Sequence, residues 1–212
     1  MPDKTELRRA PKQERGQRRI TRILTAAALE FARVGFEAAT TNSIARRAKT
    51  SVGSLYQFFP NKEAILAALT EHYLNEIRAV HYVVLGKKAA RLLLPAFIDQ
   101  LVEGLAEFHV THPGFLGMFY GSPTSPHLAA AAEKLNRECV AGAEASIAAR
   151  LPTLDPLRRR LYATITVQVI RALLPLAEAA GPAHRAQVLG EIKKLLMSYM
   201  DGVKAEILAE DA

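Results

Sequence analysis

Residues 51–62 concentrate side chains that can recognise nucleic acid. The amide of Gln57 can form a paired hydrogen bond with adenine N6 and N7, and the hydroxyl of Ser54 suits several bases. An apolar group such as Val52 or Phe58 can contact a thymine methyl. These residue types point to direct contact with base edges in a major groove.

Neighbouring residues suit the DNA backbone rather than the bases. Gly53, which has no side chain, lets the main chain approach a partner closely. Polar side chains that contact phosphates position a protein without distinguishing sequence. The phosphate candidates are Thr41, Arg46, Ser51, Tyr56 and Lys62.

Elsewhere, candidate catalytic groups lack the partners that chemistry requires. His109 and His112 could share a helix face as metal ligands, but no third ligand stands at a helpful spacing. Cys139 has neither a nucleophile elbow nor an orienting pair beside it. The spacing of Glu103 and Glu107 is typical of a solvated helix face. We therefore expect no enzymatic activity, no metal and no cofactor.

Two short helices joined by a tight turn would position the base-contacting residues. The pattern predicts a first helix over 41–48, a turn at 49–51 and a second helix over 52–59. Leu55 and Phe59 are four residues apart and should face inward onto the first helix. This is the helix-turn-helix arrangement, in which the second helix enters the major groove. The expected N-caps are Thr40 or Thr41, then Ser51, then Asn61.

The rest of the chain also has helical periodicity, with turns marked by glycine and proline. Apolar residues at three- and four-residue spacing predict a helix over 17–34, ended by Gly35, and a long helix from Asn61. Further helices are expected over 88–110, 113–120, 125–150, 155–180 and 182–208. We predict an all-α protein of about nine helices.

The positive charge is confined to one part of the chain. Residues 1–62 hold 13 Lys and Arg against five Asp and Glu, a net charge of +8, whereas residues 63–212 have a net charge of −1. A basic segment attached to a neutral body is typical of polyanion binding. The single Cys139, the charged N-terminal residues and the absence of a long apolar run predict a cytoplasmic protein without a membrane partner.

Residues 1–16 form an expected flexible basic arm. Arg8, Arg9, Lys12 and Arg15 could enter a minor groove beside the major-groove site. They could equally add only general affinity for phosphates. The sequence leaves both possibilities open.

The segment TTNSIARRAKTSVGSLYQFFPNKEAIL, preceded by ARVGFEA, closely resembles the signature of TetR-type regulators. The matching positions, at fixed spacing across three helices, are Ile44, Ala45, Ser51, Gly53, Leu55, Tyr56, Phe59 and Lys62. The resemblance covers roughly residues 17–66. It implies a DNA-binding domain over 17–62 and a ligand-binding and dimerisation domain over 63–212. It also implies a homodimer through the last two helices, and most often a repressor that a small molecule releases from operator DNA. An activator, or a regulator without a ligand, remains an alternative.

Two positions depart from the family pattern. The turn usually runs Ala-Gly-Val-Ser, and here Lys49 stands in place of the glycine. A lysine there must adopt a conformation that costs about 1 kcal/mol. Ala39 replaces a frequent threonine, which removes one capping or phosphate contact.

The middle and last helices supply candidates for a ligand pocket and a dimer interface. A mainly apolar cavity with a few polar groups is typical of small-molecule sites, so we expect a largely apolar ligand. The pocket candidates are Tyr82, Phe97, Phe108, His112, Phe115, Phe119, Tyr162, Gln168 and Arg171. Arg171 could anchor an acidic ligand or could meet a carboxylate at an interface. The apolar stripes of the last two helices could pack against a twofold mate or within one chain.

Overall fold

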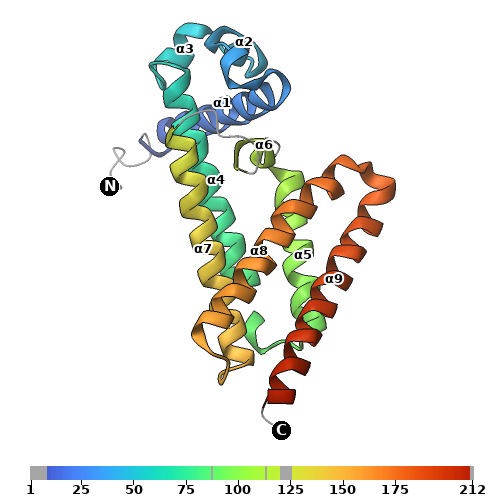
Figure 1. The fold of residues 1–212 in the computed structure, drawn as a ribbon. Helices are drawn as coiled ribbons and strands as arrows, with labels where there is room; N and C mark the ends of the chain where they lie inside the picture. Colours follow the sequence, from blue (N-terminus) through green and yellow to red (C-terminus); the bar gives the residue numbers. More distant parts are fainter. Residues whose placement is uncertain (1–8, 87, 113, 120–125, 211–212) are drawn as a thin grey trace, which may run out of the picture. The chain divides into compact units, whose positions relative to one another are not determined.

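The computed structural model describes residues 9–86, 88–112, 114–119 and 126–210, and within them the chain forms helices and no strand (Figure 1). This confirms the predicted all-α class. The elements are α1 (Arg9–Ala38), α2 (Thr41–Arg47), α3 (Val52–Tyr56), α4 (Lys62–Val84), η1 (Ala89–Arg91), α5 (Leu94–Thr111), α6 (Phe115–Phe119), α7 (Pro126–Arg150), α8 (Pro156–Ala179) and α9 (Gly181–Glu210).

The chain divides into two compact units. The first comprises Met1–Tyr73 with Pro113–Leu128, and the second comprises Leu74–His112 with Ala129–Ala212. The division falls within α4 and not at the predicted boundary between residues 62 and 63. The reason is that Ile65 and Leu69, in the first half of α4, are fully buried side chains of the first unit.

The first unit packs α1, α2 and α3 around apolar residues that the helical periodicity predicts. Ile23 and Ala27 of α1 are completely buried, as are Ile44 of α2 and Leu55 of α3. At Gly35 the backbone has φ 77° and ψ 164°, which breaks the regular helix. Because only glycine adopts this region without strain, Gly35 ends the regular part of α1 where the sequence predicts.

The second unit has its own apolar core, formed where α7, α8 and α9 meet. The buried residues of this cluster are Val140, Ala143, Ile147, Leu154, Tyr162, Ala163, Val167, Met200 and Val203. Val140, Ala143 and Ile147 of α7, Ala163 and Val167 of α8, and Met200 and Val203 of α9 recur at three- or four-residue spacing, so each helix presents one apolar face to the others.

Several predicted boundaries differ from the structure. Helix α3 ends at Tyr56, three residues before the predicted end. The predicted arm is already helical from Arg9, because a proline such as Pro11 is tolerated in the first turn, where backbone N–H groups have no intrahelical partner. Residues 1–8 of the arm, including Arg8, lie outside the described residues. The predicted helix over 88–110 is interrupted, and α5 begins at Leu94. The ring of Pro95 would clash with the carbonyl of Arg91 in a continuous helix.

Among the described residues, α8 is the one helix long and apolar enough to cross a membrane by length and composition. A third of its apolar window is buried within the second unit. A core helix of a globular protein gives the same pattern, so this finding alone does not indicate a membrane.

Candidate functional site

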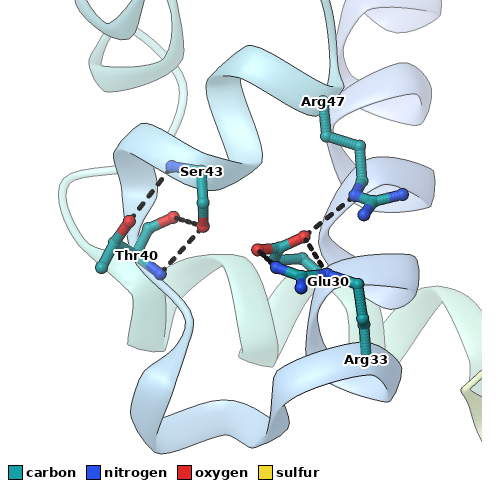
Figure 2. Close-up of polar contacts among 5 residues, drawn as sticks. All are labelled: Glu30, Arg33, Thr40, Ser43 and Arg47. Carbon is teal, nitrogen blue, oxygen red and sulfur yellow. Dashed lines mark hydrogen bonds and ion pairs between the residues drawn. The ribbon is translucent and has the colours of Figure 1, made fainter.

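Hydrogen-bonding side chains begin each helix of the predicted helix-turn-helix. Thr40, and not Thr41, caps α2: its Oγ1 accepts from the Ser43 backbone N–H at 3.1 Å, and the Ser43 Oγ accepts from the Thr40 N–H at 3.2 Å. This reciprocal pair, visible in Figure 2, is a capping box. Ser51 caps α3 through the Ser54 N–H at 3.1 Å. Asn61 accepts from the Ala64 N–H at 2.8 Å at the start of α4.

The turn between α2 and α3 contains a left-handed lysine. Lys49 has φ 51°, and no other described non-glycine residue has a positive φ. This confirms the conformation expected for the residue that replaces the glycine of the turn. The left-handed region brings Cβ close to the following carbonyl, which costs about 1 kcal/mol. In return, an exposed cation stands beside the N-terminus of α3.

Helix α3 has one buried face and one exposed face, as predicted. Leu55 is completely buried and Phe59 is buried, whereas Gly53 and Gln57 are exposed. Val52, Ser54 and Phe58 are half-buried at the edge of the exposed face. A Cβ added at Gly53 would meet no heavy atom within 4 Å, so the backbone there is open to a close partner.

The exposed faces of α2 and α3 are held to each other by polar side chains. The Tyr56 hydroxyl lies 3.1 Å from the Thr41 Oγ1, although Tyr56 is 50% exposed. Arg46 is exposed in the last turn of α2. Hydroxyl groups and a guanidinium arranged beside an open helix N-terminus have the chemistry of a phosphate-binding surface.

A buried carboxylate that the sequence analysis did not single out fixes α2 against α1. Glu30 is 3% exposed; its Oε1 accepts from Arg33 Nη2 at 2.8 Å and its Oε2 from Arg47 Nε at 3.0 Å (Figure 2). The hydrogen bond from Arg33 lowers the pKa of Glu30 to about 2, with a further contribution from Arg47 and against the opposing effect of burial. The sequence carries one indication of this site, since Glu30 falls on the apolar stripe of Ala27 and Phe31.

Lys62 has a different position from the predicted phosphate contact. Its ammonium group donates to the carbonyls of Phe36 and Glu37 at 2.9 Å and of Ala39 at 3.4 Å, and it lies 4.5 Å from the centre of the Phe36 ring. These carbonyls lie at the end of α1 and directly after it, where backbone carbonyls have no intrahelical partner. Lys62 therefore joins α4 to the end of α1.

The predicted pocket residues do not come together. Phe97 lines a cavity in the second unit, whereas Tyr82 is 83% exposed because the buried face of α4 passes through Ile77 and Val84. Phe115 and Phe119 stack at 4.6 Å within the first unit.

The other candidates bond or stack outside the cavity. Phe108 stacks on His112 at 4.1 Å, and the His112 Nδ1 lies 2.8 Å from the Phe108 carbonyl. Tyr162 donates to Glu206 at 3.2 Å. Exposed Gln168 and partly buried Arg171 donate to the Asn136 Oδ1 at 3.1 and 2.6 Å. Their polar groups thus have partners within the protein.

The cavity itself lies among α5, α7, α8 and α9 and has a volume of about 40 Å³. Its lining is apolar except for Ser146, Arg150 and Thr166. Arg150 is a functional candidate that the sequence did not reveal. As the last residue of a helix, followed by Leu151 and Pro152, it has the position of an ordinary C-terminal cation.

Histidine and cysteine also meet inside the second unit. The Cys139 Sγ lies 3.7 Å from the His81 Nε2, and burial raises the pKa of Cys139 to about 12 and lowers that of His81 to about 4. Near neutral pH both groups are uncharged, so the thiolate that nucleophilic catalysis requires does not form. Among the described residues, no three His, Cys, Asp or Glu side chains are placed to hold a metal ion.

Two family models match separate parts of the chain. Residues 23–69 match the family model for bacterial regulatory proteins of the tetR family. Residues 94–200 match the model for a tetracyclin repressor-like C-terminal domain.

Individual relatives are similar as well. An HTH-type transcriptional repressor of Streptomyces coelicolor is 29% identical over 126 residues, which are 57% of this chain and 60% of that repressor's length. The chain thus matches less than two thirds of the relative. The fold resembles a TetR-like transcriptional regulator from Rhodococcus, with a TM-score of 0.71 at 16% identity, covering 87% of this chain and 96% of that chain. A TetR-family transcriptional regulator from Streptomyces coelicolor has a TM-score of 0.56 at 22% identity, covering 87% and 99%.

Proposed function

Because the chain belongs to the TetR family of bacterial regulatory proteins, we propose that it is a homodimeric transcriptional repressor that a small molecule releases from its operator DNA. The observation that carries the proposal is the exposed face of α3, held over a buried Leu55 beside a strongly basic segment. A helix inserted in a major groove requires this combination of an inward apolar anchor and an outward polar face.

The proposed base contacts come from the exposed side of α3 and the two residues that follow it. Gln57 would contact an adenine, Ser54 a neighbouring base, and Val52 or Phe58 a thymine methyl. The proposed phosphate contacts are Thr41, Arg46, Ser51 and Tyr56, with Lys49 added because its cation is exposed in the turn. They do not include Lys62, whose ammonium group caps α1.

A dimer is required for two recognition helices to reach half-sites about 34–36 Å apart. Helices α8 and α9 supply an apolar surface for it. Leu157, Leu161 and Ile165 repeat every four residues along α8 and are 80%, 55% and 37% exposed, and Leu176 and Leu195 are also exposed. An open groove between the two helices is lined half by leucine, valine and isoleucine and half by polar residues, among them Glu191 and Lys194. A second copy of the same helices would bury these residues.

Release by a ligand requires that the ligand prefers a conformation with low DNA affinity. Changing the ratio of two states from 1:99 to 99:1 takes a difference in binding free energy of about 5.5 kcal/mol. Helix α4 is the proposed lever, since its residues belong to both units and Leu85, directly after it, lines the cavity. The proposed location is the cytoplasm, where the DNA is.

The test is an anisotropy titration of the full chain with labelled DNA from immediately upstream of its gene, against scrambled DNA at physiological salt. Nanomolar binding with a preference of about a thousandfold or more supports the proposal. Gln57→Ala should weaken binding by about 1–3 kcal/mol and relax preference at one base pair. Gln100→Ala, at a glutamine of α5 that lines neither the cavity nor the groove, is the matched control and should change neither.

Equal, weak and salt-sensitive binding to both DNAs would be followed by selection from random DNA. If no sequence is enriched, the basic segment binds only as a polycation and the proposal is wrong. Equal losses on operator and random DNA for Gln57→Ala would refute direct base contact by that residue.

A further inference from the structure

The second-unit cavity combines an apolar wall with an arginine that has no anionic partner. Leu94, Ile98, Leu101, Ile147, Leu196 and Met200 supply most of the wall. Arg150 lines the same cavity, and its guanidinium carbon lies 3.9 Å from the centre of the Phe97 ring. Within the described part of the chain, no carboxylate lies within ion-pair distance of Arg150, so its charge is uncompensated in an apolar setting.

Some but not all of the N–H donors of Arg150 have hydrogen-bond partners. Its Nη1 donates to the Ser146 carbonyl at 2.9 Å and its Nη2 to the Ala89 carbonyl at 3.0 Å. The buried Nε has no hydrogen-bond partner. A guanidinium carries five N–H groups, so the protein binds two of them and three stay available, with the Nε–H among them.

A second unsatisfied polar atom lies in the same wall. The Thr166 Oγ1 is buried and has no hydrogen-bond partner, although threonine hydroxyls in helices commonly donate to the carbonyl four residues earlier, as Thr164 does to Arg160 at 2.8 Å. Buried donors without partners cost free energy unless a ligand or water supplies the acceptor. Among the described residues, neither the Arg150 Nε nor the Thr166 Oγ1 has an acceptor, and both side chains line one cavity.

We propose that this cavity binds a small apolar carboxylate, whose anionic group pairs with Arg150 and accepts a hydrogen bond from Thr166. A carboxylate has two coplanar oxygens, which match the parallel N–H groups on one edge of a guanidinium. The remainder of the ligand would contact the aliphatic wall. This proposal names the ligand class for the proposed function. Ligand binding itself does not depend on that function; only release from operator DNA rests on it.

The size of the cavity gives binding a conformational consequence. A volume of about 40 Å³ holds a few water-sized groups and is smaller than such a ligand. Binding therefore requires that the helices around the cavity move apart. A ligand that binds only the widened state shifts the population toward that state.

The test uses isothermal titration of the full chain, without DNA, with the straight-chain carboxylates from butanoate to dodecanoate and the primary alcohols of equal length. The carboxylates should bind at least tenfold more tightly than the alcohols. Arg150→Gln should remove this preference and leave alcohol binding within twofold. Arg159→Gln is the matched control: Arg159 also donates to a carbonyl, that of Leu154 at 2.7 Å, and does not line the cavity.

Thr166→Val separates ligand binding from folding. It should weaken carboxylate binding by about fivefold to tenfold while leaving the melting temperature of the free protein unchanged or higher, since it removes an unsatisfied buried hydroxyl. If no carboxylate binds at millimolar concentration, if alcohols bind as tightly, or if Arg150→Gln keeps the preference, the proposal is overturned. Carboxylate binding that leaves operator binding unchanged would instead contradict only the proposed release, because the titration contains no DNA.

Discussion

Replacing Gly53 by alanine separates the stability of the recognition helix from its contact with DNA. Gly53 is the second residue of α3, it is exposed, and a Cβ there meets no heavy atom within 4 Å. Alanine loses less conformational entropy than glycine when a helix forms. We therefore expect Gly53→Ala to raise the free energy of unfolding by roughly 0.5–1 kcal/mol. In a chain of this length that corresponds to a rise in melting temperature of about 1–4 °C.

The same methyl group should weaken DNA binding, because it projects where the proposed complex brings the backbone against the major groove. We expect operator affinity to fall by about tenfold to a hundredfold, or about 1.4–2.8 kcal/mol. A more stable protein that binds DNA less well is not explained by partial unfolding. The loss would therefore locate the contact at this residue.

Both quantities can be measured on one preparation, with thermal unfolding followed by circular dichroism and operator binding by anisotropy. Gly190→Ala in α9, whose Cβ also meets open space within the chain, is the control for stability and should raise the free energy of unfolding by a similar amount. Wild-type affinity in Gly53→Ala would refute a close approach of DNA to α3, and a lower melting temperature would refute the open space around Gly53.

Substitutions at Lys49, Glu30 and Lys62 test the contacts that hold α2 and α3 in place. Lys49→Gly should stabilise the protein against urea by about 1 kcal/mol because φ 51° is strained for lysine, and Lys49→Ala, which keeps the strain, should not. Glu30→Gln should lose about 2 kcal/mol in the same measurement. Because the pKa of Glu30 is lowered from 4.5 to about 2, its contribution is complete above pH 4.5 and disappears as the pH falls toward 2; a wild-type advantage that stays constant across this window would contradict the assignment. Lys62→Met should lower stability by about 1–2 kcal/mol, because three carbonyls lose their donor. A salt dependence of DNA binding that becomes shallower by about 0.9 in log–log slope would show that Lys62 contacts a phosphate instead.

The local geometry of the proposed DNA-binding surface could be predicted because its determinants are local in sequence. Leu55 and Phe59 face inward through a four-residue period, and Lys49 takes a positive φ because the turn geometry of a few neighbouring residues demands it. Each of these depends on residues fewer than ten positions apart. The end of the regular part of α1 follows in the same way from Gly35, which acts on the adjacent turn.

The cavity could not be predicted because it depends on which helix faces meet. Phe97, Arg150, Thr166 and Met200 come from four different helices. The sequence alone does not distinguish an arginine that lines a cavity from one that bonds to a neighbouring helix. In the structure, Arg171 donates to the amide oxygen of Asn136, whereas Arg150 lies against Phe97 in the apolar cavity. Helical periodicity identifies an apolar face but does not specify the face it packs against.

Helix α4 contributes residues both to the unit that contains α2 and α3 and to the unit that contains the cavity. At its first residue, Lys62 is bonded to the last carbonyls of α1, so the beginning of α4 cannot move without the DNA-binding helices. Directly after its last residue, Leu85 contributes to the wall of the cavity, and the Ser146 hydroxyl donates to the Leu85 carbonyl at 3.5 Å. A ligand that widens the cavity acts on this end of the helix. Helix α4 is one element of 23 residues, and the proposed response passes through it without requiring a change within α2 or α3.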